Sequence, residues 1–469
     1  MFLLFILLPL FSLIVLNLPF RAMMKKAAFW WLLVLLALQV YLAIGYVFGF
    51  FGFDLNAPIY PLSFSLNVDN FGCVALLSTA VVLGAVLLAA KYIIKEEEKL
   101  FNFISLLFII LAGSNGLALT TDIFSLYIFI EITTVASFIL ISFDKEKLVL
   151  EAVFKYIILS AVATVLMLLS IALFLLVSGK TDFSAIHAVL INSPHSLIVM
   201  FATGVFICAL FIKGGLMPFH GWLPDVYSSA PAPVSALLAG IITKLVGIFT
   251  LMRLLVSVVN FDNPIRQVIL FVGALSVVAG ALAAAGQSDF KRMLAYSSIS
   301  QVGYIVLGLG AGNALGIMGA LFHLFNHSVF KSSLFINSAA IELQAGTRDM
   351  NKLGGLSAKM PVTSTTCLIS SLSTAGMPPL AGFWSKLIIV LALWASGNYG
   401  YAALAVIAGI LTLAYFISMQ RRVFFGNIKE EFAGIKEPGF GLLLPACLLS
   451  AITIGLGLVF PFCLKLLKF

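Results

Sequence analysis

Charged residues are scarce in this chain. Only 10% of its 469 residues are Asp, Glu, Lys or Arg, whereas 62% are hydrophobic. A soluble domain carries about 25% charged residues, so this composition excludes a soluble protein of the same length. Apolar runs long enough to cross a bilayer recur along the chain, and they lack the strict alternation of a transmembrane β-barrel. The sequence therefore predicts an all-α integral membrane protein embedded in the lipid bilayer.

Cysteine is also rare, and its spacing excludes several kinds of site. The five cysteines lie far apart and no CxxC motif is present. This pattern indicates neither a zinc knuckle nor an iron–sulfur cluster. We therefore expect no cofactor and no redox centre in this chain. The net charge of +8 has a simpler origin in membrane topology than in nucleic acid, so no nucleic-acid partner is expected.

The distribution of basic residues predicts the orientation in the membrane. The apolar runs predict roughly 14 transmembrane helices in a single polytopic domain over residues 1–469, with short loops. Most of the 27 Lys and Arg fall in alternate loops, including 91–99, 143–150 and 420–437. Because basic residues concentrate in cytoplasmic loops, these loops are predicted to be cytoplasmic. In a multi-pass protein of the cell membrane with an even number of spans, both termini are then outside.

Two of the predicted spans, 198–229 and 361–396, are too long for one straight crossing. Each contains proline near its middle, at Pro218 and Pro378. Proline removes a backbone hydrogen bond, so we predict that both helices are broken around these residues. The sequence MPFHGW at the first break is similar to MPP followed by GFW at the second. The two spans cross in opposite directions, which is typical of an inverted repeat with broken helices.

Five ionisable residues lie near the middle of predicted spans. A charge at this depth costs at least about 2.5–3.5 kcal/mol, so such residues face a protein interior or a wet cavity. Buried ion pairs that fix helix packing are one explanation, but one acid cannot neutralise four lysines. Burial favours the neutral form of lysine, and a lysine between charge states can take up and release protons. We therefore predict proton handling by this set, which comprises Glu131, Lys213, Lys244, Lys331 and Lys386.

His323 and His327 add two further titratable groups. They stand four residues apart, and Lys331 follows after four more, so all three share one face of a helix. Histidine titrates near neutral pH, which favours a proton wire. Hydrogen-bonded core histidines and a metal site are the alternatives. A metal site is not expected, because Leu324 stands where an HExxH motif has glutamate and no nearby carboxylate offers a third ligand.

Four segments carry a family resemblance. KGGLMPFHGWLPDVYSSAPAPVSALLAGIITKLVGI (213–248), QSDFKRMLAYSSISQVGY (287–304), FHLFNHSVFKSSLF (322–335) and MPPLAGFWSK (377–386) occur in this order. They resemble motifs of the antiporter-like membrane subunits of complex I (NADH:quinone oxidoreductase), of Mrp-type cation/proton antiporters and of membrane-bound hydrogenases.

The resemblance covers roughly residues 65–425. It implies a 14-helix fold with two inverted five-helix repeats, which we place at 100–257 and 267–419. It also implies a role in proton translocation that is driven by a redox reaction or coupled to Na⁺. The resemblance thus implies a translocating subunit of a redox-driven pump and not a complete enzyme. Its expected partners are other membrane subunits and protons, and Na⁺ is an open alternative.

The resemblance also assigns roles by position. Glu131 matches the glutamate of the fifth family helix and Lys213 its partner lysine on the seventh. Lys244 matches the central lysine of the eighth helix. Lys155 matches a lysine that some members carry on the sixth.

The second half of the chain supplies the other matching positions. His323, His327 and Lys331 match the relay of the eleventh family helix. Lys386 matches the terminal residue of the twelfth, which exchanges protons with one side of the membrane. Two other classes stay open: a self-contained secondary transporter, including an Mrp-type Na⁺/H⁺ antiporter subunit, and a structural scaffold, which leaves the deep charges unexplained.

Overall fold

The fold is seen in a computed structural model that describes residues 3–18, 21–47, 66–193, 196–259 and 263–463. These residues form helices and isolated bridges, with no strand among them, so the all-α prediction is confirmed. Eleven candidate spans within them are long and apolar enough to cross a membrane. The chain is therefore an integral multi-pass membrane protein. The count of roughly 14 helices stays a prediction, and both termini, predicted on the outside, lie beyond the described residues.

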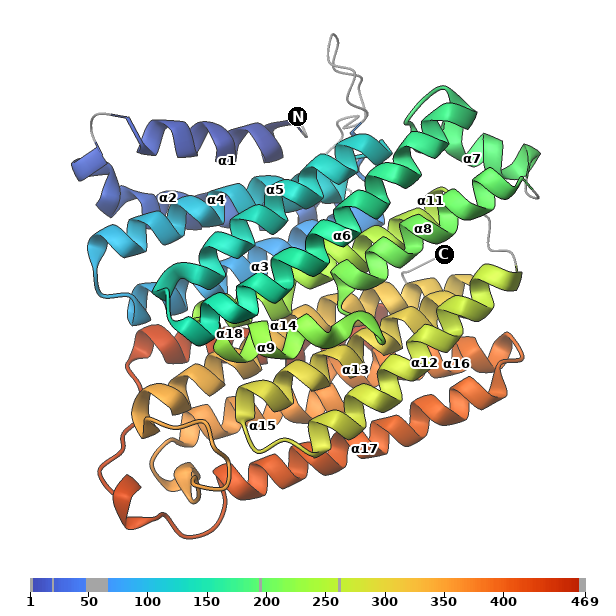
Figure 1. Cartoon of the computed structure of the whole chain (residues 1–469). Helices are drawn as coiled ribbons and strands as arrows, with labels where there is room; N and C mark the ends of the chain where they lie inside the picture. The colour runs from blue at the N-terminus through green and yellow to red at the C-terminus, as the bar shows by residue number, and fades with distance from the viewer. Residues whose placement is uncertain (1–2, 19–20, 48–65, 194–195, 260–262, 464–469) are drawn as a thin grey trace. The chain divides into compact units, whose positions relative to one another are not determined.

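The helices group into two compact units. Unit 1 comprises Met1–Leu87, Ile94–Gly215 and Ile241–Asp262, and unit 2 comprises Leu88–Ile93, Leu216–Gly240 and Asn263–Phe469. Within each unit the long helices run side by side (Figure 1). The predicted repeat at 100–257 falls mostly in unit 1, and the one at 267–419 falls in unit 2.

Unit 1 is built from the N-terminal helices and one later segment. Its elements are α1 (Leu3–Leu16), α2 (Arg21–Val47), most of α3 (Asn70–Ile93), α4 (Glu97–Leu119), α5 (Ile123–Ile141), η1 (Ser142–Asp144), α6 (Lys147–Ser178), α7 (Phe183–Asn192), α8 (Leu197–Gly214), the π-helical η4 (Lys244–Phe249) and α11 (Thr250–Ser257).

Unit 2 contains the remaining helices, and the π-helical η3 (Leu238–Ile242) runs from it into unit 1. Its own elements are η2 (Phe219–Gly221), α9 (Trp222–Ser229), α10 (Ala232–Leu237), α12 (Asn263–Ala285), α13 (Phe290–Gly310), α14 (Ala314–Ala345), η5 (Leu356–Ala358), α15 (Pro361–Ala375), α16 (Ala381–Ala395), α17 (Tyr399–Val423), η6 (Glu430–Phe432) and α18 (Phe440–Cys463).

Local capping residues fix the ends of the helices that carry the predicted site. The side chains of Asp122, Asp289 and Asn313 cap α5, α13 and α14 by accepting a hydrogen bond from the backbone N–H three residues later, at 2.6, 2.8 and 2.7 Å. Such caps satisfy N–H groups that lack a partner within the helix. At the other end, Gly179 after α6 and Gly346 after α14 adopt a left-handed conformation, with φ of 69° and 65°. Glycine does so without steric cost, so both helices end there.

The two predicted helix breaks are present. α8 ends at Gly214 and the next α-helix begins at Trp222, whereas α15 ends at Ala375 and α16 begins at Ala381. Both helices end before the prolines of the sequence prediction. The reason is that Gly215 and Gly376 take left-handed conformations, with φ of 66° and 88°, so the helix has already ended when the chain reaches proline.

An equivalent pair of bridges occurs once in each unit. Asp122, just before α5, bridges Asp182, which follows α6. Asp289, just before α13, bridges Asp349, which follows α14, at the same sequence separation. In both cases two backbone hydrogen bonds of 2.9–3.0 Å flank the bridge in the same pattern. The same bridge pattern thus joins the ends of α5–α6 and of α13–α14, and the inverted repeat itself stays a prediction.

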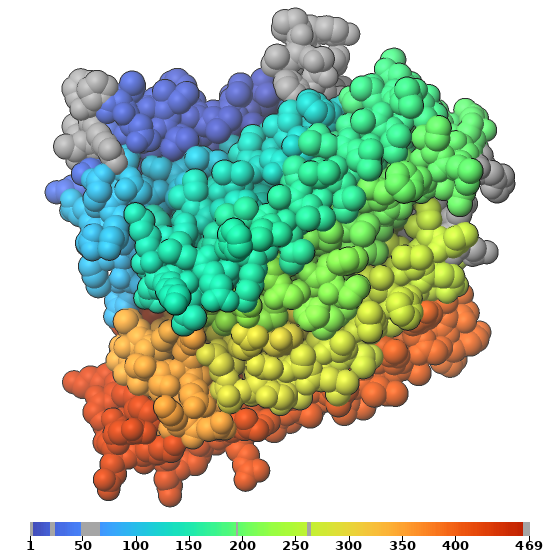
Figure 2. All heavy atoms as spheres, viewed as in Figure 1, coloured from blue at the N-terminus to red at the C-terminus, as the bar shows by residue number. Residues whose placement is uncertain are grey.

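Apolar side chains cover the outer face of α6. Leu148, Phe154, Val165 and Leu176 are all more than half exposed, and α6 lies on the face of the molecule that Figure 2 shows. Exposed apolar surface of this kind faces lipid or a neighbouring membrane protein.

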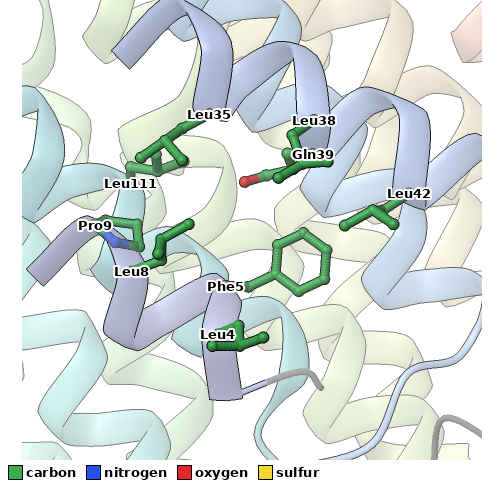
Figure 3. Close-up of a pocket in the computed structure, with 9 residues that line it drawn as sticks. All are labelled: Leu4, Phe5, Leu8, Pro9, Leu35, Leu38, Gln39, Leu42 and Leu111. Carbon is green, nitrogen blue, oxygen red and sulfur yellow. The ribbon is translucent and has the colours of Figure 1, made fainter. Parts of the chain in front are cut away.

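Unit 1 also contains a small apolar cavity between α1, α2 and α4. It measures about 110 Å³, and Leu8, Leu35 and Leu111 are among its lining residues (Figure 3). Gln39 is the polar residue of this lining, and its Nε2 donates hydrogen bonds to Asn115 Oδ1 at 2.9 Å and to Leu76 O at 3.0 Å. The Gln39–Asn115 pair thus ties α2 to α4 in the interior of the unit.

Candidate functional site

Glu131 and Lys213 form an ion pair in unit 1. Lys213 lies in the last turn of α8, and its Nζ is 2.9 Å from Glu131 Oε1 on α5. The Lys213 side chain is fully buried, whereas the Glu131 side chain is 26% exposed. A lysine so far from water needs an opposite charge or strong hydrogen-bond acceptors to remain protonated. The structure therefore joins the mid-membrane acid to one of the four deep lysines.

Two hydroxyl groups of α6 complete this cluster. Lys213 Nζ donates to Ser160 Oγ at 2.6 Å, and Thr164 Oγ1 donates to Glu131 Oε1 at 2.7 Å. Ser160 and Thr164 are one turn apart, so a single face of α6 binds both members of the ion pair. Neither residue was predicted from the sequence. Their four-residue spacing was visible, but serine and threonine are ordinary in membrane helices.

Lys155, the α6 residue that the sequence analysis singled out, lies elsewhere on the same helix. Its Nζ is 3.0 Å from Glu151 Oε1, one turn earlier, and both side chains are about half exposed. The α6 side chains that bind the Glu131–Lys213 pair are instead Ser160 and Thr164. A role of Lys155 in proton transfer stays a prediction.

Lys244 is the first residue of the π-helical segment η4. Its side chain is fully buried, and its Nζ lies 3.5 Å from Thr243 Oγ1. π-helical turns are rare and occur often at functional sites. The sequence predicted an ordinary helix here, and the apolar residues around Lys244 carry no feature that distinguishes the two helix types.

A glycine contact holds η4 directly against α8 beside Lys213. A Cβ atom placed on Gly247 would lie 2.3 Å from Gly214 Cα and 2.4 Å from Gly214 N. These are backbone atoms and cannot move as a side chain can. The backbones that carry Lys213 and Lys244 therefore meet at this point, which requires glycine at position 247.

We expect Gly247→Ala to destabilise unit 1, because overpacking a close contact costs about 1–3 kcal/mol. The measurement is the thermal stability of the purified protein in detergent. Gly204→Ala is the matched control, because Gly204 lies on the same α8 and nothing lies within 4 Å of the Cβ position there. Equal stability of the two variants would contradict the close approach of η4 and α8.

His323, His327 and Lys331 lie along one face of α14 in unit 2. All three side chains are fully buried. The two imidazole rings are nearly parallel, with ring centroids 6.2 Å apart and an interplanar angle of 12°. Lys331 Nζ donates to Ser297 Oγ at 2.6 Å and to Leu294 O at 3.2 Å, both on α13. The structure thus places the predicted stripe of titratable groups in the interior of unit 2.

The other end of this stripe meets α16. His323 Nδ1 is hydrogen-bonded to Ser385 Oγ at 2.8 Å, and Lys386 is the next residue. Lys386 Nζ donates to Thr374 O at 2.7 Å and to Ala375 O at 3.5 Å. These are carbonyl groups of the last turn of α15, where the helix dipole is negative and favours a cation. The break after α15 therefore supplies the acceptors for Lys386.

Tyr304 on α13 lies next to both His323 and Lys386, and it was not predicted from the sequence. Its ring centroid is 5.9 Å from that of His323 and 4.3 Å from Lys386 Nζ. The second distance is that of a cation–π contact. A cavity of about 270 Å³ borders Tyr304 and Lys386, and its lining includes Gly376 and Gly409. Lys386 thus borders a cavity whose other lining side chains, apart from that of Tyr304, are apolar.

One further buried cation has a structural partner that the sequence did not reveal. Arg253 on α11 forms a two-pronged ion pair with Asp69, at the start of α3, and its Nη2 donates to Ala118 O at 3.0 Å. These bonds tie three segments of unit 1 together, and Asp69 balances the charge of Arg253.

The part of the chain that the structure describes contains no group of three or more His, Cys, Asp or Glu side chains placed to hold a metal ion.

Comparison with protein families identifies the chain. The transmembrane family described as NADH:quinone oxidoreductase/Mrp antiporter matches residues 120–412. This range contains Glu131, the four deep lysines and both histidines of α14. The chain belongs to this family. The resemblance predicted from the four sequence segments is therefore confirmed.

Relatives of this chain carry the names of two kinds of complex. The chain is 34% identical over 427 residues to a Na(+)/H(+) antiporter subunit of Alkalihalophilus pseudofirmus, covering 90% of this chain and 86% of that one. It is also 34% identical over 368 residues to an NADH-quinone oxidoreductase subunit of Desulforudis audaxviator, covering 76% and 73%. The two relatives bear different names at equal identity, so sequence identity does not separate the two kinds of complex.

Two solved structures have the same fold as this chain. A chain of the Mrp complex from Dietzia sp. DQ12-45-1b matches with a TM-score of 0.89 and 26% identity over 99% of this chain and 95% of that one. A chain of the membrane-bound sulfane sulfur reductase, an archaeal respiratory membrane complex, matches with a TM-score of 0.85 and 27% identity over 98% and 95%. Both structures are of multi-subunit membrane complexes.

Proposed function

We propose that this chain is a proton-translocating subunit of a multi-subunit complex in the cell membrane, related to complex I, to membrane-bound hydrogenases and to Mrp antiporters. The observation that carries the proposal is the buried Glu131–Lys213 ion pair, bound by Ser160 and Thr164 inside membrane helices. Buried charges in membrane helices mark ion or proton pathways more often than packing contacts. The two relatives named above belong to complexes of this kind.

The pair acts as an electrostatic switch in this proposal. While Glu131 is ionised and in contact, its charge holds Lys213 protonated. When the contact is broken, the charge of Lys213 opposes protonation of Lys244, whose segment lies against the end of α8. Lys244 then releases its proton toward the groups of unit 2. The titrations of these groups are coupled, so the pair responds as one unit.

In unit 2 the proton passes along the stripe of α14 and leaves at Lys386. Lys331, His327 and His323 offer titratable groups at successive turns of one helix. Lys386 adjoins a cavity and the carbonyl end of α15. We place the last step of the path, exchange with water on one side of the membrane, at this residue. The complete 14-helix plan with two inverted five-helix repeats belongs to the same proposal.

An Mrp-type Na⁺/H⁺ antiporter subunit is the second candidate. It is favoured by the 90% coverage of this chain in the match to the Alkalihalophilus antiporter subunit and by the TM-score of 0.89 to the Mrp complex. The two candidates differ in the source of energy, which is a redox reaction in one case and an ion gradient in the other.

Reconstitution in liposomes tests the proposal and separates the candidates. The complex is purified through a tag on this chain, and proton movement is followed with a pH-sensitive dye. A redox-linked complex moves protons when an electron donor and acceptor are supplied, whereas an antiporter complex moves them when a Na⁺ gradient is imposed. The chain alone is expected to show neither activity. Substrate exchange by the chain alone would identify a self-contained secondary transporter and contradict the proposal.

The orientation can be checked independently. We expect the loops at 91–99, 143–150 and 420–437 to face the cytoplasm, because most basic loop residues lie on that side. A single cysteine introduced by Lys429→Cys in a cysteine-free background should react with a membrane-impermeant maleimide only after the cytoplasmic face is opened. Labelling of this cysteine in intact cells would contradict the predicted topology. A cysteine introduced at Lys180, in a loop predicted on the opposite face, serves as the control.

A further inference from the structure

Gln301 on α13 is a buried polar residue that the proposed pathway has not used. Its side chain is fully buried in unit 2. Neither Nε2 nor Oε1 of its amide has a hydrogen-bond partner among the residues that the structure describes. Leaving both ends of a buried amide without a partner is costly, and such groups in native proteins usually bind water or an ion. Gln301 therefore indicates a ligand at this position.

Two neighbours on α13 define where Gln301 lies. Ser297, one turn earlier, accepts a hydrogen bond from Lys331 Nζ at 2.6 Å. Tyr304, one turn later, packs against His323 with ring centroids 5.9 Å apart. α13 and α14 are antiparallel neighbours joined by a short connection, so these two contacts fix their register. Residues three and four apart share a helix face, and Gln301 therefore lies along the stretch of α14 between Lys331 and His323.

Two more polar atoms on this stretch of α14 lack a protein partner. They are His323 Nε2 and Asn326 Oδ1, and both side chains are almost completely buried. The other polar atoms of these side chains are occupied, since His323 Nδ1 is bonded to Ser385 Oγ and Asn326 Nδ2 donates to Ala381 O at 3.1 Å. The pattern is that of groups that share ordered water, because a buried water usually makes about three hydrogen bonds to otherwise unsatisfied polar groups.

We propose that Gln301 positions a water molecule that conducts protons between Lys331 and the two histidines of α14. An amide both donates and accepts hydrogen bonds, so it can hold such a water without itself gaining or losing a proton. Gln301 is accordingly a positioning residue. This inference rests on the proposed function, because it assigns the medium through which the α14 stripe conducts. The titratable side chains of α14 then need not contact one another, because water can bridge the distance between them.

The test compares two replacements of Gln301 in the assembled complex. Gln301→Met keeps the volume and removes the amide, and we expect it to lose most of the proton translocation. Gln301→Asn keeps an amide in a shorter side chain, and we expect it to retain a large part of the rate. A residue needed only for packing would give the reverse order, with Met tolerated better than Asn. The reverse order would overturn the inference.

Two reference variants separate this inference from the proposed function. Gln420→Met is the matched control, because Gln420 is also a buried glutamine of unit 2 with one unpaired amide oxygen, and it lies on α17. We expect it to translocate protons at the wild-type rate. Lys331→Met tests the stripe itself. If Lys331→Met is inactive while Gln301→Met is fully active, Gln301 has no role but the pathway stands; if both are fully active, the pathway through α14 is wrong as well.

A structural measurement covers the case in which Gln301→Met fails to assemble. A cryo-electron microscopy map of the wild-type complex at a resolution that shows water should contain density within hydrogen-bond distance of the Gln301 amide and of a titratable group on α14. A map in which protein atoms alone surround the amide would overturn the inference.

Discussion

Replacing Glu131 by Gln is expected to abolish coupled proton translocation while the protein still inserts and assembles. Glutamine keeps a carbonyl that can accept from Lys213 Nζ and Thr164 Oγ1, which bind the same Glu131 oxygen at 2.9 and 2.7 Å. It removes the negative charge that holds the buried lysine protonated. Lys213→Ala removes the other half of the switch and should have the same effect. The measurement is proton translocation by the complex in liposomes, normalised to the amount of assembled subunit.

Glu96→Gln is the control for this pair of variants. Glu96 also forms an ion pair, with Lys99 at 2.9 Å, but both side chains are more than half exposed. Exposed pairs contribute about 0–1 kcal/mol, so this variant should translocate protons normally. Normal translocation by Glu131→Gln or by Lys213→Ala would contradict the switch and leave the pair with a packing role.

The sequence predicted the charged residues of the site better than the neutral ones. A charge in a membrane helix is rare because it is costly, so Glu131, Lys213 and Lys244 stood out without any structure. The ion pair between Glu131 and Lys213 joins residues far apart in the sequence, and its prediction came from the family resemblance alone. The structure shows this pair. The relay roles themselves stay predictions.

Neutral polar residues could not be found in this way. Ser160, Thr164 and Tyr304 contact the charged groups in the structure. A hydroxyl or amide costs little in a membrane helix, because it can bond to the backbone or to a neighbouring helix. Such residues therefore occur at many positions that have no function. Only the tertiary contacts show which of them face a buried lysine or histidine.

Backbone irregularities were predicted where one residue forces them and missed where packing does. Proline made both helix breaks visible in the sequence, although Gly215 and Gly376 end the helices a few residues earlier. The π-helical turns of η3 and η4 have no comparable residue. Gly247 lets another backbone approach one side of the segment closely, but its partner Gly214 lies in another helix. That contact could not be read from either segment alone.

Lys244→Arg is expected to stop proton translocation even though it keeps a positive charge. Lys244 is fully buried at the start of η4, and its sequence neighbours within four residues include no acid. A relay residue has to lose its proton in every cycle, and the guanidinium of arginine keeps its proton at any accessible pH. Lys244→Ala cannot carry the proton and should fail too. A lysine with a purely structural role should tolerate Arg better than Ala.

Lys291→Arg provides the comparison that separates charge from size. Lys291 is also buried, but its Nζ is paired with Glu342 at 2.9 Å, so a fixed positive charge satisfies its role. We expect this variant to assemble and translocate protons normally, which shows that a buried lysine of this protein accommodates the larger guanidinium. Each rate is normalised to the amount of assembled complex. Translocation by Lys244→Arg at the rate of Lys291→Arg would show that a fixed charge suffices at position 244, and Lys244 would then have no part in the relay.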